Sequence, residues 1–278
     1  MTFHLNFFMV RRILFFIIFS ALIIACTKNA ITGRGQYKLL SESALQSLAL
    51  QEYQSFLTTH RVVSSYVNRD ADMVRRVGQR ITKAVENYYA SKNLSKELEG
   101  YKWEYNLVDD KTVNAWCMPG GKIVVYTGLL PISQNEAALA VVLGHEVSHA
   151  IFNHGNERMS QLLTAQIGEL GLEIALKDKP AETRNLFLNA YGLGATAGLL
   201  LPFSRKHEYE ADRYGLYWAA TAGYNPQEAI PLWERMQKAA NSQNSPEFLS
   251  THPDEGNRIK RLQQYMPEAL KMYKPVSN

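Results

Sequence analysis

The stretch VVLGHEVSHAIFNH, residues 141–154, places two histidines four residues apart, with a glutamate directly after the first. Positions four apart lie on one face of an α-helix, so His145 and His149 can bind the same metal ion. Glu146 is rotated by about 100° from His145 and is better placed to reach a water molecule at that ion. The pattern therefore predicts half of a metal site and a catalytic acid.

The residues around this motif indicate where its helix lies. EAALAVVLGHEVSHAIFNH, residues 136–154, is apolar on nearly all sides, which is typical of a helix inside a fold. Ser133 and Glu136 have the spacing of a capping box and are expected to open the helix. A catalytic zinc takes three protein ligands and leaves a fourth position for water, so another ligand must come from elsewhere.

Two residues near the motif are weaker candidates for that ligand. His154 is half a turn out of phase with the first histidine, so we expect it at the surface or in a second layer. Glu169 follows the second histidine by the 20 residues that thermolysin-like enzymes use, but it occupies an ordinary polar position of an amphipathic helix. The metzincin pattern is excluded, because Phe152 and Gly155 stand where it needs glycine and histidine.

Glu208, in PFSRKHEYEADRYG (residues 202–215), is the stronger candidate. Asp212 follows one helical turn later, where an acid can accept a hydrogen bond from a ligand histidine and fix its orientation. Glu210, between the two, is expected on a solvated face. We predict that His145, His149 and Glu208 bind one Zn²⁺, with Asp212 behind them.

The rest of the chain predicts a predominantly α-helical α+β domain over residues 41–274, with a small sheet beside the metal-binding helix. YKWEYNLV (101–108) and KIVVYT (122–127) read as strands. Helical periodicity recurs over residues 41–57, 71–89, and about 157–177, 183–197, 204–222, 226–240 and 256–272. The apolar, glycine-rich residues 191–203 are too short to span a membrane and are expected to pack near the site, with contact to a membrane surface as the alternative.

KIVVYT comes just before the metal-binding helix and is predicted as an edge strand that an incoming peptide would extend. The expected substrate-binding residues are Asn114, Gly120, Gly121, Lys122, Ile123 and Val124. The alternative is a strand that is paired on both sides inside the sheet.

The N-terminus has the pattern of an export signal. A short segment ending in two arginines precedes the apolar ILFFIIFSALIIA, which predicts a signal peptide over residues 1–25. Cys26 stands where the apolar run gives way to polar residues, as in a lipobox, so we expect lipidation there and a tether over residues 26–40. The alternative is an ordinary signal peptide or signal anchor. Thr27 after the cysteine, rather than aspartate, favours the periplasmic face of the outer membrane.

The charge balance argues against nucleic-acid binding, and the cysteine content indicates the role of Cys117. The chain has 30 Lys and Arg against 26 Asp and Glu, and removing residues 1–25 with Arg11 and Arg12 leaves 28 against 26. No basic block is present, so nucleic acid is not an expected partner. Once Cys26 carries lipid, Cys117 is alone and is expected to be a small buried apolar residue.

HEVSH, followed after 58 residues by the ExxxD of SRKHEYEAD, resembles the HtpX/CAAX-prenyl-protease type of zinc metallopeptidase. NAWCMPGGKIVVYTGLL, LLLPFSRKHEYEADRYGL and STHPDEGNRIKRL are similar to its branch of periplasmic lipoproteins and the related mitochondrial Oma-type protease. The resemblance implies a zincin-like fold, with zinc on His145, His149 and Glu208 and with Glu146 as general base and acid. It also implies a lipid-anchored endopeptidase that acts on envelope proteins in quality control.

The same resemblance places STHPDEGNRIKRL near the cleft. Pro253 favours an extended backbone at His252, and Arg258 follows on the next helix. Both side chains are candidate catalytic donors to the oxyanion of a tetrahedral intermediate. Two alternatives stay open: His252 holds the open position of the zinc until substrate displaces it, or the pair are an ordinary loop histidine and a surface arginine.

A rival function is a non-catalytic, zinc-stabilised envelope assembly factor or chaperone. The intact Glu146 argues against it, because a site without chemistry has no need of that acid. A thermolysin-like secreted protease is disfavoured by the lipobox and by Glu208. We therefore expect this chain to bind polypeptide substrates, to reach a membrane through its lipid, and to interact with partners in outer-membrane protein assembly.

Overall fold

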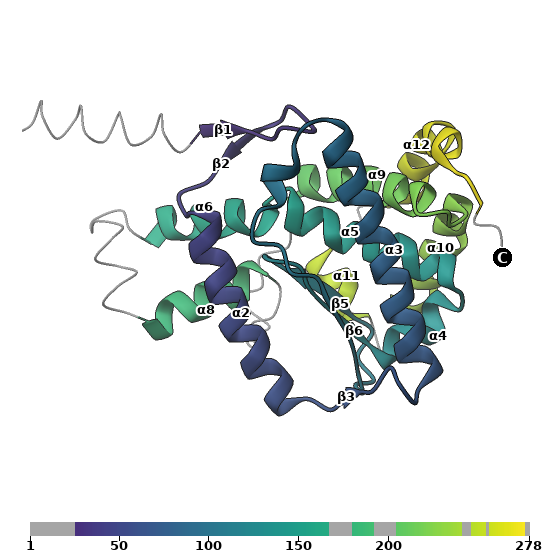
Figure 1. Ribbon diagram of the computed structural model, residues 1–278, viewed down its shortest axis with the longest axis horizontal. Helices are drawn as coiled ribbons and strands as arrows, with labels where there is room; N and C mark the ends of the chain where they lie inside the picture. Colours follow the sequence, from purple (N-terminus) through teal and green to yellow (C-terminus); the bar gives the residue numbers. More distant parts are fainter. Residues whose placement is uncertain (1–25, 167–179, 192–203, 241–245, 254–255, 276–278) are drawn as a thin grey trace, which may run out of the picture.

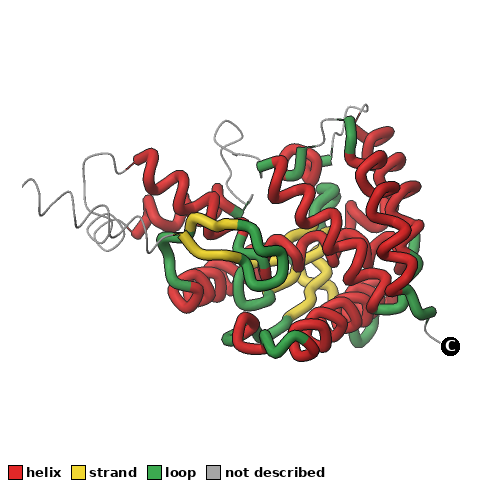
Figure 2. Tube along the Cα trace, turned by 90° about the horizontal axis from the view of Figure 1, so that it is seen from above, coloured by secondary structure: helices red, strands yellow, loops and turns green. Residues whose placement is uncertain are grey.

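The computed structural model describes residues 26–166, 180–191, 204–240, 246–253 and 256–275. The expected signal peptide, Glu169 and nearly all of residues 191–203 lie outside these ranges. Helices enclose a small sheet, so the predominantly helical α+β class is confirmed (Figures 1 and 2).

The sheet has four strands in the order β3-β4-β6-β5. Their bounds are β3 (Val62–Val63), β4 (Glu104–Val108), β5 (Ala115–Met118) and β6 (Lys122–Tyr126). β6 runs parallel to β4 and antiparallel to β5, with Cys117 opposite Ile123. The prediction that residues 122–127 form an edge strand is therefore wrong, because β6 is paired on both sides and β5 is the edge beside it.

A tight turn is the physical reason for this difference. Gly120 and Gly121 have φ of 77° and 83°, in the left-handed region that glycine enters without steric cost. They fold the chain back directly after Met118, so that residues 115–118 pair with β6 as a strand. NAWCM, followed by PGG and KIVVY, carries the hairpin signal of two apolar runs around a turn.

Side chains alternate between the two faces of the sheet along β5 and β6, and helices pack on both faces. One set packs with α3 (Arg69–Ser91) and α5 (Glu136–Ile151), and comprises Ala115, Cys117, Ile123 and Val125. The other set packs with α2 (Glu42–Thr59), α6 (His154–Gln166) and α8 (Pro180–Ala190), and comprises Trp116, Met118, Val124 and Tyr126. Cys117 is buried, as predicted for a small apolar residue.

Helix α5 runs through the centre of the molecule, and every residue from 138 to 151 is buried. Its N-cap is Asn135, whose side chain accepts a hydrogen bond from the Ala138 amide at 2.8 Å. The predicted capping box is wrong, because Ser133 ends the short helix α4 (Leu130–Ser133) and its hydroxyl bonds to the Leu130 carbonyl. A positive φ at Gln134 separates the two helices.

Helix α9 (Arg205–Thr221) crosses α5 at two glycines. A Cβ atom on Gly144 would lie 2.5 Å from the Gly215 carbonyl oxygen, and one on Gly215 would lie 2.6 Å from the His145 nitrogen. Only glycine permits so close a backbone approach. The crossing brings the two histidines of α5 next to the acids of α9.

The remaining elements close the fold around this pair. Asn225 caps the turn η3 (Pro226–Glu228), which leads into α10 (Ala229–Ala240), as the Asn-Pro pair predicts. The other elements are η1 (Ser95–Leu98), η2 (Thr127–Leu129), α11 (Glu247–Thr251) and α12 (Arg258–Met272).

Residues 26–37 are not a plain tether. β1 (Cys26–Lys28) and β2 (Gly35–Tyr37) form an antiparallel hairpin, and the Gln36 side chain is buried beneath it. The Leu39 amide then bonds to the hydroxyl of Ser160 on α6 at 2.9 Å. The segment directly after Cys26 is thus part of the folded domain.

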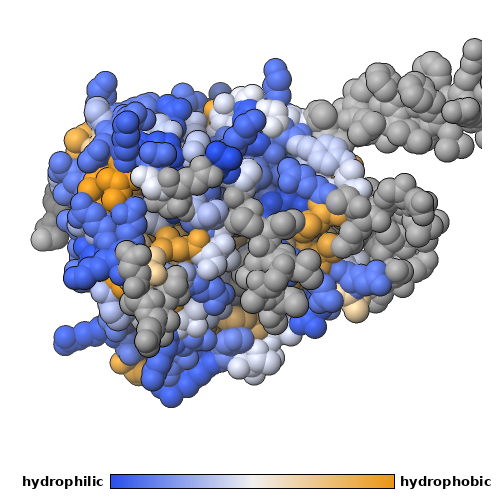
Figure 3. Space-filling view, turned by 180° about the vertical axis from the view of Figure 1, so that it is seen from behind, coloured by the Kyte–Doolittle hydropathy of each residue, from blue (hydrophilic) through white to orange (hydrophobic). Residues whose placement is uncertain are grey.

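Among the described residues, no helix is long and apolar enough to cross a bilayer. Where its residues are described, the face in Figure 3 is mainly hydrophilic, with separate small hydrophobic areas.

Candidate metal centre

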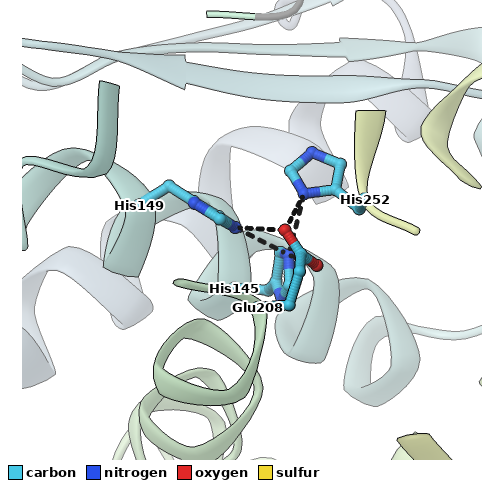
Figure 4. A group of neighbouring side chains, drawn as sticks. All are labelled: His145, His149, Glu208 and His252. Atoms are coloured by element: carbon cyan, nitrogen blue, oxygen red, sulfur yellow. Dashed lines mark hydrogen bonds and ion pairs between the residues drawn. The ribbon is translucent and has the colours of Figure 1, made fainter. Parts of the chain in front are cut away.

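Four buried side chains from three parts of the chain converge at the α5–α9 crossing (Figure 4). His145 and His149 come from α5, Glu208 from the first turn of α9, and His252 from the end of α11. One candidate ligand atom from each lies within 4.8 Å of all the others. The structure thus brings the three predicted ligands together and adds His252 to them.

The distances fit a single metal ion. The Nε2 atoms of His145 and His149 lie 3.0 Å apart. Glu208 Oε2 lies 3.5 Å from the Nε2 of His145, and Glu208 Oε1 lies 3.4 Å from the Nε2 of His149. Burial lowers the pKa of His149 well below its usual value, which keeps the imidazole neutral as a ligand must be. Burial alone would raise the pKa of Glu208, but the neighbouring His252, His149 and His145 hold it well below its usual value. Imidazole nitrogens with one carboxylate are a donor set that zinc prefers.

Each of the two motif histidines has a partner on its other ring nitrogen. His145 Nδ1 lies 3.0 Å from Asp212 Oδ1, so Asp212 stands where it was expected. His149 Nδ1 lies 3.0 Å from the Nδ1 of His154, which is fully buried. His154 therefore belongs to the second layer, and its surface alternative is wrong because the turn at Asn153, with φ of 58°, returns the chain toward the site.

Glu210 is also placed differently from its prediction. Its side chain is only 8 % exposed and its Oε2 lies 2.8 Å from His154 Nε2. Arg34 of the β1–β2 hairpin donates to the same oxygen at 2.9 Å. The hairpin thus covers a helix face that the sequence alone predicts to be solvated.

Glu146 lies beside the four-residue group and is buried. Among the described residues, its Oε1 has no hydrogen-bond partner, and the nearest ring nitrogen of His252 is 3.5 Å away. Burial raises the pKa of Glu146 to about 8, against an opposing effect of His145. A divalent cation at the ligand atoms would lower that pKa, because it favours the carboxylate.

A narrow pocket joins this carboxylate to the sheet edge. Its walls are Asn114, Ala115, Trp116, Cys117, Glu146, His149, Gly155, Tyr191, Thr251 and His252. β5, and not β6 as predicted, therefore supplies the edge strand beside the metal centre. Asn114 lies in this wall as expected, with its amide 3.3 Å from Glu247.

The other five predicted substrate-binding residues do not line this pocket. Lys122, Ile123 and Val124 are buried in the interior strand, and the Lys122 ammonium bonds to the Lys102 carbonyl and to Glu104. Gly120 and Gly121 form the turn after β5, against Gln46 and Trp103. Their part in the site is indirect, because the turn sets the register of β5.

Comparison with known proteins gives the family. The model of "Peptidase family M48" matches residues 75–266, which is more than half of the chain and includes the whole four-residue group. The chain belongs to peptidase family M48. Zinc is the metal of M48 peptidases, and the ligand group accords with it.

Several known proteins are similar to this chain over part of their length. The chain is 38 % identical over 169 residues to the mitochondrial metalloendopeptidase OMA1 of Schizosaccharomyces pombe, covering 60 % of this chain and 48 % of that protein. It is 40 % identical over 185 residues to OMA1 of Arabidopsis thaliana, covering 66 % and 36 %. The beta-barrel assembly-enhancing protease of Escherichia coli is 29 % identical over 163 residues, covering 56 % and 33 %. The chain thus spans half or less of the length of these relatives.

Within the M48 site, His252 and Arg258 are both buried, so the alternative of a loop histidine and a surface arginine is wrong. His252 Nδ1 lies 3.0 Å from Glu208 Oε1 and 3.2 Å from His145 Nε2. Arg258 lies behind the ligands: its Nε donates to Asp212 Oδ2 at 2.8 Å, and its Nη2 donates to Glu208. These contacts favour a positioning role for Arg258 over contact with substrate.

Proposed function

We propose that this chain is a lipid-anchored zinc metalloendopeptidase of the cell envelope. The observation that carries the proposal is Glu146: a buried carboxylate oxygen without a hydrogen-bond partner in the described chain, beside a zinc-type donor group and a sheet edge. Burying a carboxyl oxygen without a hydrogen bond costs stability, which supports a chemical role for it. Membership of family M48 and likeness to metalloendopeptidases support the reaction class.

His145, His149 and Glu208 would hold the zinc. When bound, the ion supplies a Lewis acid that polarises the scissile carbonyl and lowers the pKa of water. Glu146 accepts the proton of the attacking water and delivers it to the leaving amine. Asp212 accepts a hydrogen bond from the Nδ1–H of His145 and so keeps that imidazole in the tautomer whose Nε2 is a ligand.

The substrate is a polypeptide in an extended conformation. β5 is the edge of the four-stranded sheet and lines the pocket with Ala115, Trp116 and Cys117. An added peptide strand there would pair through its backbone, which recognises shape more than sequence. Such recognition suits unfolded or unassembled proteins as substrates.

The envelope location rests on the N-terminal sequence. The apolar run followed by Cys26 supports export and lipidation, and Thr27 supports the outer membrane. The likeness to the beta-barrel assembly-enhancing protease supports substrates or partners among outer-membrane proteins. The second candidate, a zinc-stabilised assembly factor without catalysis, is disfavoured by Glu146.

The test is cleavage of casein by the full chain in detergent, with and without a zinc chelator. We expect chelation to abolish cleavage and zinc to restore it. Glu146→Gln should retain one zinc and lose about 10²–10⁴-fold in kcat, because it removes a proton acceptor and not a ligand.

Glu208→Ala provides the matched comparison, since it should lose both zinc and activity. Glu169→Ala should retain both. Cleavage by Glu146→Gln near the wild-type rate would refute the mechanism, and zinc loss in Glu169→Ala but not in Glu208→Ala would refute the ligand set.

A further inference from the structure

The β1–β2 hairpin reaches the back of the metal centre although it lies outside residues 75–266 that the family model matches. It packs beside α6 (Figure 1). Arg34 precedes β2 and is mostly buried, with its side chain 21 % exposed. Its guanidinium contacts two acids, Glu210 on α9 and Glu157 on α6.

A series of hydrogen bonds leads from His149 through His154 and Glu210 to Arg34, and it fixes where each proton lies. If Nε2 of His149 is a ligand, Nδ1 carries the proton and donates to His154 Nδ1 at 3.0 Å. His154 must then carry its own proton on Nε2, which lies 2.8 Å from Glu210 Oε2. Arg34 Nε donates to that same oxygen at 2.9 Å and fixes the carboxylate.

His145 is held by a shorter version of the same arrangement. Its Nδ1 faces Asp212, and the other oxygen of Asp212 accepts from Arg258. Each motif histidine is therefore backed by a carboxylate that an arginine holds. For His145 all partners lie within the matched family region, whereas for His149 the chain ends in the N-terminal hairpin.

We infer that Arg34 is a positioning residue of the metal centre, which orients His149 through Glu210 and His154. The inference rests on the proposed function, in which His149 is a zinc ligand. Partners behind a ligand fix its tautomer and ring orientation, and their loss typically weakens metal binding by about 10–100-fold. The segment that directly follows Cys26 would thereby be required for a well-formed site.

A competing explanation is that the hairpin only braces the fold. A substitution at Gln36 distinguishes this explanation from a positioning role of Arg34. Gln36 lies on the same hairpin and donates to Glu157 at 2.8 Å and to the Phe152 carbonyl at 2.5 Å. Its hydrogen bonds go to Glu157 and Phe152 rather than to Glu210 or His154, so Gln36→Met is a matched control for Arg34→Met.

The experiment measures zinc affinity of the full chain in detergent by competition with a chromophoric chelator. We expect Arg34→Met to weaken zinc binding about 10-fold or more, and Gln36→Met to stay within about twofold of wild type. The zinc affinity of Arg34→Lys should lie between those of the wild type and Arg34→Met, since one ammonium cannot contact both acids as a guanidinium does. The Co²⁺-substituted protein should show a changed visible spectrum for Arg34→Met and an unchanged one for Gln36→Met.

Equal weakening in Arg34→Met and Gln36→Met would overturn the inference, as would unchanged affinity in Arg34→Met. If Arg34→Met does not fold, Arg34→Lys takes its place, and an affinity no weaker than that of Gln36→Met rejects the role. The zinc content and casein cleavage of the wild-type chain report the proposed function separately.

Discussion

At the scale of single residues, the metal centre is defined by which polar atoms have partners. Asp212 bonds to His145 and Arg258, and Glu208 accepts from Arg258, whereas Glu146 Oε1 has no hydrogen-bond partner in the described chain. Buried polar atoms are nearly always satisfied, so an unsatisfied carboxylate oxygen beside the ligand group accords with the proposed role of Glu146 as proton acceptor. Positioning and catalysis are thus divided between neighbouring acids.

His252→Ala tests the fourth member of the group. Its Nδ1 lies among the ligand atoms, 3.2 Å from His145 Nε2, and we propose that it competes there with water or substrate. We expect kcat on casein to rise by severalfold, with one zinc retained by metal analysis. A fall in kcat with zinc retained would instead assign an oxyanion donor, and unchanged values of both would remove His252 from the mechanism.

At the scale of elements, the site depends on how closely α5 and α9 approach. Gly144 and Gly215 allow backbone contact at the crossing, one residue before His145 and three residues after Asp212. Helix packing at this separation is possible only without Cβ atoms. The two glycines therefore set the distance between the histidines and Glu208.

Gly215→Ala should disturb the site despite the better helix propensity of alanine. The new Cβ would lie 2.6 Å from the His145 backbone nitrogen, so α9 must shift. We expect a loss of about 1–3 kcal/mol in the free energy of unfolding and weaker zinc binding, measured by urea unfolding and chelator competition.

Gly35→Ala is the control, because a Cβ there meets nothing within 4 Å. It should change stability by less than about 0.5 kcal/mol. Equal effects of the two substitutions would show that the crossing tolerates a side chain.

At the scale of the whole molecule, charged side chains connect the N-terminal hairpin to two helices. Burial raises the pKa of Glu157, but hydrogen bonds from Arg34 and His207 outweigh it and bring the pKa to about 2. A folded-state pKa below the usual 4.5 means that ionised Glu157 stabilises the fold above pH 4.5. This stabilisation is lost as the pH falls from 4.5 toward 2.

The pH dependence can be measured by comparing wild type with Glu157→Gln in urea unfolding. Near pH 6 the variant should be less stable by about 2 kcal/mol, after allowance for solvent screening of the partly exposed Arg34. The difference should shrink steadily between pH 4.5 and 3. A difference that is constant with pH would exclude ionised Glu157 as its source.

Cys26→Ser tests the proposed lipid anchor of the whole chain. Removing the thiol should prevent lipidation, so the protein should move from the membrane fraction to the soluble fraction. Wild-type protein in the inner-membrane fraction would refute the outer-membrane assignment while leaving the anchor intact. Cys117→Ser is the matched control, because Cys117 is buried in the core.

The sequence by itself determined the parts that depend on local spacing. His145 and His149 share a face because the helical period is 3.6, and the all-round apolar pattern of residues 136–154 predicts a central helix. Glu208 and Asp212 lie one turn apart for the same reason. These relations hold in any fold that keeps the two helices.

Only the tertiary structure decided which residues from separate segments meet. It placed β5 rather than β6 at the sheet edge, since the turn at Gly120 and Gly121 pairs the chain with itself. It also buried His154 and Glu210 beneath Arg34, more than 100 residues away in the sequence. Such contacts follow from packing and hydrogen bonding between distant elements, which periodicity along one segment does not encode.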